Sequence, residues 1–352
     1  MQPVHDFIQR AVDEEHFTHA CLIVAQNGQP LIHESYGKAG LDSVFDLASL
    51  TKPLATTAVL MQLVAQNKLA LKMRLFQAIP SLVGRPVGPL NFAQLLTHSA
   101  GLAAWYPFFE QVRDIPFSKR KAAVRRMLAG QTLEYKPDST TLYSDLGFML
   151  LGWAIEKSIG HRLDILAKKL IFRPLGLNST FFVPLTKAGM RPKDFEKWPF
   201  VPTEKCPWRG RRLLGEVHDD NCHVMGGVAG HAGLFSIAHD VHLLTRELFA
   251  AYLGERSIFS PKVVRTFWDW RIPHSARALG WDRASDQERG NKVGFGPNTV
   301  GHLGFTGTSL WVDLDRAFWV IFLTNRVYKG REPNPMPQVR KGLHDLILRH
   351  VS

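Results

Sequence analysis

The spacing of hydrophobic residues changes along the chain and divides it into strands near both ends and helices between them. Residues 3–15 have the period of an amphipathic helix, and residues 20–25 and 30–36 predict two strands around a turn at Asn27-Gly28. Helical periodicity then continues to about residue 177. The predicted helices of this middle region are residues 54–65, 93–97, 122–129, 147–157 and 162–172.

The second half of the chain starts with a segment of a different kind. Residues 181–230 are rich in Pro, Gly, Lys and Trp and have little periodicity, which predicts a long, ordered loop region over the surface. Loops of that length usually line a site. Residues 239–253 return to a helical pattern, residues 299–324 predict strands, and residues 336–350 predict a closing C-terminal helix.

Strands at both ends of the sequence, with helices between them, favour an α+β fold in which the two ends build one sheet. We expect a single domain over residues 1–352. Its sheet lobe takes about residues 1–48 and 231–352, and its lobe of helices and long loops takes about residues 49–230. A groove between two such lobes is a common place for a ligand site.

The composition is that of a globular protein. The chain has 352 residues, 45% of them hydrophobic and 21% charged, which is enough for a large buried core. No apolar run is long enough to span a bilayer. Residues 1–16 are polar and acidic, unlike a signal peptide, so we expect a cytoplasmic protein, or a periplasmic one if a leader has been removed. Cys21, Cys206 and Cys222 have no zinc spacing and cannot all pair, which fits a reducing compartment.

The chain is basic, with a formal net charge of +12. Part of this charge is clustered at residues 119–126 and 209–212. Such runs usually mark solvated surface. The alternative is electrostatic attraction of an anionic substrate, such as a muropeptide with several carboxylates. No nucleic-acid reader motif accompanies the charge, so nucleic acid is not an expected partner.

Ser49 and Lys52 are the first candidate catalytic residues. They lie three positions apart in Ser49-Leu50-Thr51-Lys52, where an irregular segment becomes an apolar helix. Residues i and i+3 share a helix face, so the lysine amine can reach the serine hydroxyl. Such a serine is a nucleophile with its own base when the environment favours the neutral amine. Read alone, the pair also fits an N-cap serine and a solvated lysine.

A tyrosine precedes the next strongly apolar helix. Tyr143-Ser144-Asp145 comes directly before the apolar run of residues 146–153, which puts a phenol beside a helix N-terminus. Asp145 is placed to act as the N-cap of that helix. A buried core tyrosine without a chemical role is the alternative for Tyr143.

The third candidate element is a strand edge near the C-terminus. Gly-His-Leu-Gly-Phe at residues 301–305 leads into an apolar run at residues 309–313. A short turn and a second run at residues 317–324 follow. This pattern predicts a strand, a turn and a returning strand.

The three elements, in this order, resemble the serine β-lactamase and penicillin-binding-protein superfamily, whose pattern is S-x-x-K, then Y-x-N or S-x-N, then K-T-G or H-x-G. Within it the chain is most similar to class C-like serine hydrolases, especially amidases and esterases of cell-wall recycling. The likeness covers roughly residues 15–330. Further segments that carry it are residues 95–102, 174–177, 215–221 and 226–236.

The resemblance implies a β-lactamase/transpeptidase-like fold, with an antiparallel sheet flanked by helices, an all-helical lobe and an active site between them. It also implies a metal-independent serine hydrolase that works through an acyl-enzyme and needs no cofactor. Ser49 would be the nucleophile and Lys52 its base. Tyr143 would relay a proton to the leaving group and later activate water. Since a phenol titrates near ~10, that role needs a cation close by.

Four further residues are expected to bind substrate. Asp145 stands where the family usually has asparagine; ionised, it only accepts hydrogen bonds, and beside Lys52 it would hold that lysine charged. His302 stands where penicillin-binding enzymes have lysine, which implies weaker selection for a substrate carboxylate; an exposed strand histidine without a role is the alternative. Gly304 lets the backbone approach substrate, and the Phe305 and Ser49 amides would form an oxyanion hole.

The remaining histidines do not predict a metal centre. Zinc sites have recognisable ligand spacings, and the candidate ligands of this chain do not match a common one, so we expect no metal. These candidates are His98, His218, Asp219, His223 and His231.

We therefore expect a hydrolase of a small ester or amide, with a peptidoglycan-derived muropeptide as the favoured substrate. A β-lactamase or D,D-carboxypeptidase is the first alternative. A catalytically silent ligand-binding protein of the same fold is the second. The sequence indicates neither the oligomeric state nor the natural leaving group.

Overall fold

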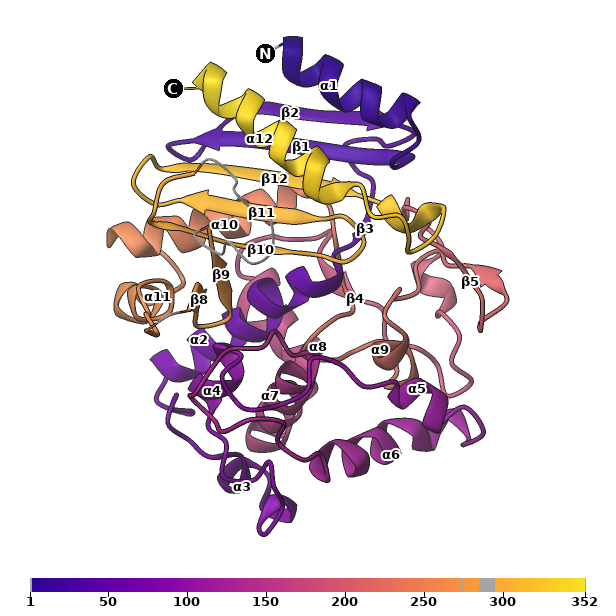
Figure 1. Cartoon of the computed structure of the whole chain (residues 1–352), viewed down its shortest axis with the longest axis vertical. Coiled ribbons are helices and arrows are strands. Elements are labelled where there is room, and N and C mark those ends of the chain that lie inside the picture. The colour runs from indigo at the N-terminus through magenta and orange to yellow at the C-terminus, as the bar shows by residue number, and fades with distance from the viewer. Residues whose placement is uncertain (1, 274, 285–294, 352) are drawn as a thin grey trace.

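A seven-stranded antiparallel sheet forms one end of the computed structural model (Figure 1), which describes residues 2–273, 275–284 and 295–351. The strand order is β2-β1-β12-β11-β10-β9-β8, so β1 from the N-terminal part of the sequence pairs with β12 from the C-terminal part. The strands are β1 (His19–Gln26), β2 (Gln29–Gly37), β8 (Arg277–Ala278), β9 (Trp281–Arg283), β10 (Thr299–Leu303), β11 (Ser309–Asp313) and β12 (Phe318–Thr324).

Strand β1 is apolar on both faces because it separates two cores. Alternate side chains of a strand point to opposite faces. Cys21, Ile23 and Ala25 belong to the larger core, which continues into the helical part of the molecule. Their neighbours Leu22 and Val24 belong to a smaller core on the other face. The nearly continuous apolar run of β1 follows from this double burial.

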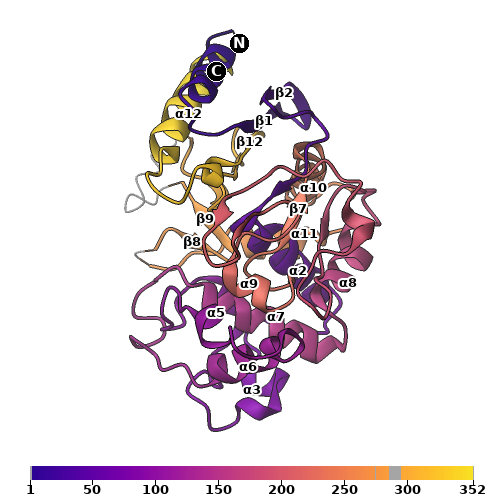
Figure 2. The ribbon, with the colours of Figure 1, turned by 90° about the vertical axis from the view of Figure 1, so that its right-hand side faces the viewer.

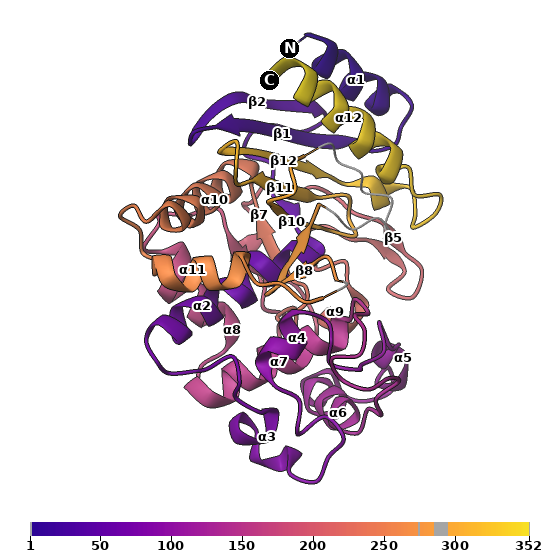
Figure 3. The same ribbon diagram turned by 60° about the vertical axis from the view of Figure 1, so that its left-hand side comes forward.

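Helices cover both faces of the sheet (Figure 2). Helices α1 (Gln2–Asp13) and α12 (Met336–Val351) pack on one face and enclose the smaller core. Helix α10 (Ala238–Leu253) packs on the other face, beside α11 (Pro261–Trp268), as Figure 3 shows. The α+β prediction, with a sheet shared by both ends of the chain, is confirmed.

The helices between residues 58 and 167 gather on the far side of α10 from the smaller core (Figure 3). The predicted helices are all present, although α6 begins five residues before the predicted start and residues 54–57 belong to a π-helical segment. The bounds are α2 (Ala58–Ala65), α3 (Leu75–Ala78), α4 (Phe92–Leu96), α5 (Phe108–Gln111), α6 (Phe117–Ala129), α7 (Asp145–Ile159) and α8 (Leu163–Ala167). The boundaries of the two expected lobes stay a proposal.

The long segment 181–230 is mostly irregular, as expected, and small sheets tie it down. Strand β7 (Leu234–Ser236) pairs with β3 (Phe45–Asp46) and β4 (Phe181–Phe182). Strand β5 (Lys205–Cys206) pairs with β6 (Arg211–Arg212), and α9 (Asp220–Val224) follows. The β3–β7 pairing brings the residues before Ser49 next to the end of this segment.

Burial of His344 on α12 gives the fold a pH-dependent stability. The side chain is fully buried against Phe295, and burial together with Arg340 lowers its pKa to about 3. The unfolded chain takes up this proton near pH ~6.5, so stability is lost as pH falls below that value. We expect His344→Leu to reduce the fall in unfolding free energy between pH 7.5 and 5.5 by about 1 kcal/mol.

Urea unfolding at both pH values measures this effect. His350→Leu, at an exposed position of the same helix, is the matched control. An unchanged pH dependence in His344→Leu would contradict the assignment.

Candidate active site

Ser49 lies at a sharp change of backbone direction. It is the middle residue of a single 3₁₀ turn, Ala48–Leu50, which continues through a π-helical segment, Lys52–Thr57, into α2. Ala48 has a φ of 48°, a left-handed conformation that residues other than glycine rarely adopt, and such strain is concentrated at functional sites. The expected helix start near Ser49 is confirmed, but its first turns are not α-helical.

Lys52 is completely buried behind Ser49 and surrounded by oxygen atoms. Its Nζ lies 2.9 Å from Ser49 Oγ, 2.7 Å from Asp145 Oδ1 and 3.1 Å from the His231 carbonyl oxygen. It also lies 4.9 Å from the centroid of the Tyr143 ring. Burial lowers the pKa of Lys52, but the Asp145 carboxylate and the Tyr143 oxygen outweigh it and keep that pKa above its ordinary value. The resting lysine is therefore an ammonium.

Tyr143 is held by other rings. Its ring lies 4.6 Å from that of His98 and 5.8 Å from that of His302, and the Arg277 guanidinium lies 5.5 Å from its centroid. His98 also accepts a 3.0 Å hydrogen bond from the Ser144 N–H, which fixes the segment that carries Tyr143. The tyrosine is thus positioned beside the Ser49–Lys52 pair.

The prediction that Asp145 caps the following helix is wrong. Ser144 is the N-cap of α7: its Oγ accepts from the Gly147 N–H and donates to the Ala103 carbonyl. Asp145 is the first residue of the helix, and its carboxylate turns to Lys52 instead. Leaving the buried Lys52 ammonium unpaired would cost far more free energy than weakening the helix cap. Asp145 therefore pairs with Lys52.

These residues line a cavity of about 310 Å³. The cavity is lined by Ser49, Tyr143 and Asp145 together with residues of the segment around α9. The lining residues are Ala48, Ser49, Trp105, Tyr143, Asp145, His218, Asp219, Asp220, His231, Ala232, Phe305 and Arg331.

His302 does not line this cavity. Its side chain is 2% exposed, packs against the Tyr143 ring, and lies with Nδ1 2.8 Å from the Leu303 carbonyl oxygen. The alternative of an exposed strand histidine is therefore wrong. In this position His302 supports Tyr143 from behind, and its role in substrate binding stays a prediction.

The turn after β10 is attached to the backbone that precedes Ser49. Thr306 Oγ1 donates to the Asp46 carbonyl at 2.7 Å, and Thr308 Oγ1 donates to the Leu47 carbonyl at 3.0 Å. Phe305 lies between Gly304 and Thr306 in the sequence, and its side chain is half-exposed at the cavity. The attachment places the Phe305 backbone beside the Ser49 turn, which is the arrangement that a shared oxyanion hole requires.

Gly304 is needed for this attachment rather than for free space at the substrate. A methyl group there would overlap Thr308 Oγ1 and lie 2.7 Å from the Leu47 carbonyl oxygen. We expect Gly304→Ala to lower the unfolding free energy by about 1–3 kcal/mol. It should also lower kcat/KM by about 100-fold, because the turn moves away from Ser49.

Urea unfolding and initial rates test this prediction. Gly130→Ala is the control, since the nearest atom to a methyl group there is 3.6 Å away. Normal stability and activity in Gly304→Ala would contradict it.

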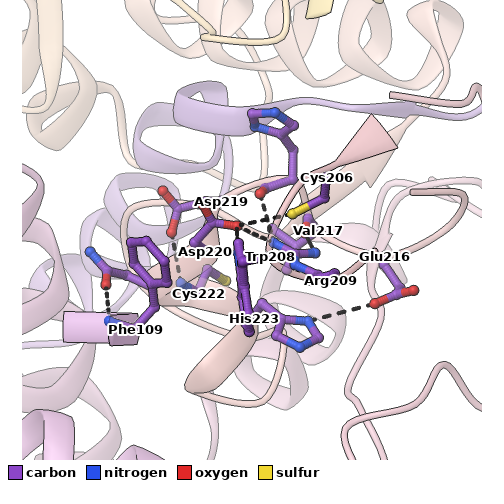
Figure 4. A network of polar contacts seen from close by, with 12 residues as sticks. Phe109, Cys206, Trp208, Arg209, Glu216, Val217, Asp219, Asp220, Cys222 and His223 are labelled. Carbon is purple, nitrogen blue, oxygen red and sulfur yellow. Dashed lines mark hydrogen bonds and ion pairs between the residues drawn. The ribbon is translucent and has the colours of Figure 1, made fainter. Parts of the chain in front are cut away.

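The part of the cavity lining near α9 is held by a polar network that the sequence did not reveal, and Figure 4 shows its members Trp208, Arg209 and Asp220. The Asp220 carboxylate accepts from Trp208 Nε1 at 2.7 Å, Arg209 Nη2 at 2.6 Å and Arg331 Nη2 at 2.8 Å. Arg331 also donates to both carboxylate oxygens of Glu204, and Glu204 Oε2 lies 3.3 Å from His218 Nε2. Arg209 is buried, so the expectation of solvated surface for this basic run is wrong at that residue.

Asp219 presents an ionised carboxylate to the same cavity. Its Oδ1 accepts from the Cys222 N–H at 2.7 Å and lies 2.9 Å from His231 Nε2. Burial raises the pKa of this carboxyl, but the His231 ring and the Cys222 N–H hold it well below its usual range. His231 therefore fixes Asp219 with its ring and Lys52 with its carbonyl group.

The other candidate ligands have structural contacts. His223 packs against the rings of Phe117 and Trp208 and lies 3.6 Å from Glu216. Within residues 2–273, 275–284 and 295–351, no group of three or more His, Cys, Asp or Glu side chains is arranged to hold a metal ion. The cysteines found there, Cys21, Cys206 and Cys222, are free thiols and buried.

An antiparallel sheet flanked by helices, with a serine and a buried lysine at the floor of a cavity, defines a class of serine hydrolases. The model of the Beta-lactamase family matches residues 4–342, and the chain belongs to that family. A "Putative D-alanyl-D-alanine carboxypeptidase" of Escherichia coli (strain K12) is 32% identical over 307 residues, 82% of this chain and 70% of the relative. An N-acetylmuramyl-L-alanine amidase of Bacillus subtilis (strain 168) is 29% identical over 361 residues, 93% and 81% of the two chains.

Solved structures show the same fold. A penicillin-binding protein homologue from Pyrococcus abyssi superposes with a TM-score of 0.74 and 19% identity, over 99% of this chain and 77% of that one. EstCE1, a hydrolase with promiscuous acyltransferase activity, superposes with a TM-score of 0.70 and 20% identity, over 97% and 98%. The protein is therefore a serine hydrolase of the Beta-lactamase family.

Proposed function

We propose that the chain hydrolyses a small amide or ester through an acyl-enzyme on Ser49, and that the substrate is a peptidoglycan-derived muropeptide. The observation that carries the proposal is the 2.9 Å contact between Ser49 Oγ and Lys52 Nζ at a cavity that Tyr143 also lines. A positioned hydroxyl with an amine beside it is the arrangement of an activated nucleophile.

The residues divide the reaction between them. Ser49 Oγ attacks the carbonyl carbon, and the Ser49 and Phe305 amides stabilise the oxyanion, each worth about 2.7–4 kcal/mol. Lys52 handles the serine proton, and Tyr143 protonates the leaving group and then activates water for deacylation. The Lys52 nitrogen lies 4.9 Å from the centroid of the Tyr143 ring, so the two groups are close enough to share this proton traffic.

The cavity favours an amide without a carboxylate next to the cleaved bond. A D-alanyl-D-alanine terminus carries such a carboxylate, and a cation should face it. His302, at the position where a cation is expected, packs against Tyr143, while Asp145 and Asp219 line the cavity. Arg331 also lines the cavity, but its guanidinium is paired with Glu204 and Asp220. The Bacillus subtilis relative is named for the amide between N-acetylmuramic acid and L-alanine. That amide has no carboxylate next to the bond that is cleaved.

Mass spectrometry of the intact protein tests the proposal. The wild-type chain is exposed to p-nitrophenyl esters, a penicillin and N-acetylmuramyl peptides, with Ser49→Ala as the control. We expect adducts of the ester acyl group on the wild type only, and release of a free L-alanyl peptide from the muramyl substrate. If ester adducts form but the muramyl peptide is not cleaved, the proposed substrate is wrong. If no adduct forms with any compound, the proposed acyl-enzyme reaction is wrong.

Two alternatives have their own readouts. Turnover of a chromogenic cephalosporin at kcat/KM values of about 10⁴ M⁻¹ s⁻¹ or more would favour a β-lactamase. Failure of a fluorophosphonate to modify Ser49 in the folded protein would favour a silent binding protein.

We propose that the hydrolase needs no metal or cofactor, so EDTA should leave its activity unchanged, and that it works in the cytoplasm. None of the described helices has the length and apolar character to cross a membrane.

A further inference from the structure

We propose that Asp145 is the terminal acceptor of the Ser49 proton, with Lys52 as the group that passes the proton on. This proposal rests on the proposed function only in so far as Ser49 becomes acylated, and it is independent of the natural substrate. It assigns a chemical role to the residue at which this chain departs from the usual asparagine of its superfamily.

The geometry around Lys52 supports the assignment. The ammonium has three N–H donors and lies 2.9 Å from Ser49 Oγ, 2.7 Å from Asp145 Oδ1 and 3.1 Å from the His231 carbonyl oxygen. The Tyr143 oxygen is a further hydrogen-bond partner. Each donor therefore has an acceptor. In this state Lys52 has no lone pair with which to take a proton from Ser49.

A base must be generated before Ser49 can attack. The Asp145 carboxylate can accept a proton, whereas the His231 carbonyl is a very weak base and Ser49 is the proton donor. Tyr143 is the competing group and is distinguished from Asp145 by the experiment below. The contact with Asp145 is also shorter than those with Ser49 and His231. An asparagine in this place would offer no such acceptor.

The proton transfers balance as follows. Lys52 gives one N–H proton to Asp145 Oδ1, which leaves a neutral amine beside a carboxylic acid. As Ser49 Oγ forms its bond to the carbonyl carbon, its O–H bond breaks and the proton moves to the amine. Asp145 then holds one proton, Lys52 is again an ammonium, and the oxyanion carries the negative charge. When the leaving group departs, Tyr143 or Lys52 protonates it, and Asp145 returns its proton to the same chain of groups.

Substrate binding favours the first transfer. Lys52 is fully buried, whereas the Asp145 side chain is 19% exposed and lines the cavity. A substrate in the cavity removes the remaining water from the carboxylate. An ion pair loses more hydration free energy on such a change than a neutral pair does, so the neutral amine and acid become more accessible at the moment of attack.

Other ionisable groups face this pair. Tyr143 and Asp219 line the same cavity as Asp145, and Asp219 is already bound to His231. Tyr143 is the competing proton acceptor, as its phenolate. The two acceptors can be separated with a substrate whose leaving group needs no proton.

Burst kinetics with p-nitrophenyl acetate make that separation, because p-nitrophenolate leaves without protonation. The burst reports acylation and the steady state reports deacylation. We expect Asp145→Asn to slow the burst about 100-fold or more, and Asp145→Glu to be at least about tenfold faster than Asp145→Asn. Tyr143→Phe should keep the burst within about threefold and lose steady-state turnover. Asp345→Asn, which removes an exposed Lys341–Asp345 pair on α12, is the matched control.

The outcomes are distinct. If Asp145 only held Lys52 charged, Asp145→Asn would free the amine and accelerate the burst near pH 7; that result would overturn the proposal while Ser49 acylation stands. Loss of the burst in Tyr143→Phe with its retention in Asp145→Asn would assign the proton to Tyr143 instead. Thermal melting of each variant shows whether it folds. If Asp145 had only a structural role, Asp145→Glu would not give a faster burst than Asp145→Asn, because asparagine has the shape of aspartate and glutamate is longer. A wild type without any burst would overturn both this proposal and the proposed function.

Discussion

Replacing Ser49 with alanine is expected to lower kcat/KM roughly 10⁴-fold or more for every ester or amide that the wild type hydrolyses. The hydroxyl is the atom that forms the covalent intermediate, and no neighbouring group can replace it: of the groups nearest to it, Lys52 is a buried ammonium and Asp145 is bound to that ammonium. Residual rates would come from the oxyanion hole and from binding alone.

Initial rates with p-nitrophenyl esters and muramyl peptides measure the loss. Ser118→Ala, at an exposed position of α6, is the matched control and should leave the rates unchanged. Binding of a non-hydrolysable analogue should survive in Ser49→Ala, because the cavity walls stay in place. A residual activity above about one hundredth of the wild type would show that another residue carries the acyl group.

Replacing Lys52 with methionine should have the second-largest effect, a loss of about 10³-fold in kcat/KM. Methionine fills the buried volume of the lysine stem but has no nitrogen to exchange protons with Ser49. Lys52→Arg should not restore activity, because a guanidinium does not become a neutral base in a protein.

Burst kinetics and steady-state rates of both variants test this prediction. Lys341→Met removes the exposed lysine of the Lys341–Asp345 pair on α12 and serves as the control. An active Lys52→Arg enzyme would mean that the charge of Lys52, and not its proton exchange, is what the reaction uses.

The sequence predicted the main elements of the fold because long periodic segments carry their own signal. Strand β1 shows this well, since its nearly unbroken apolar run reflects two cores. Helix α11 was missed, although Val263, Val264, Phe267 and Trp268 have helical spacing and are buried. Its eight residues make only about two turns, so the helical spacing in this segment is a weak signal.

The candidate site was predictable to the extent that its chemistry is local in sequence. Ser49 and Lys52 are separated by one helical turn, so their contact follows from the spacing. The position of Tyr143 beside them came from the order of the motifs, and the structure brings the three together.

Contacts between distant irregular segments left no pattern in the sequence. Arg331 and Asp220 are 111 positions apart; Arg331 lies outside every helix and strand, and Asp220 begins the five-residue helix α9, which is too short for a periodicity signal. The sequence also left two partners open for Asp145. At the start of a helix its carboxylate can cap the backbone N–H groups or pair with a distant residue such as Lys52. The need to neutralise the buried Lys52 decided between them.

The place of a residue in a motif also does not predict whether its side chain is buried. His302 occupies the strand position that the sequence assigns to substrate contact, but the side chain lies against Tyr143. Tyr143 comes from the segment before α7 and His302 from β10, so this contact depends on how separate elements pack.

The most direct test is to locate the covalent adduct on the wild-type protein. A fluorophosphonate probe, followed by peptide mapping with mass spectrometry, should place the modification on Ser49, and prior incubation with a muramyl peptide should slow the labelling. A modification at any other residue, or the same labelling of the Ser49→Ala protein, would contradict the assignment of Ser49 as the nucleophile.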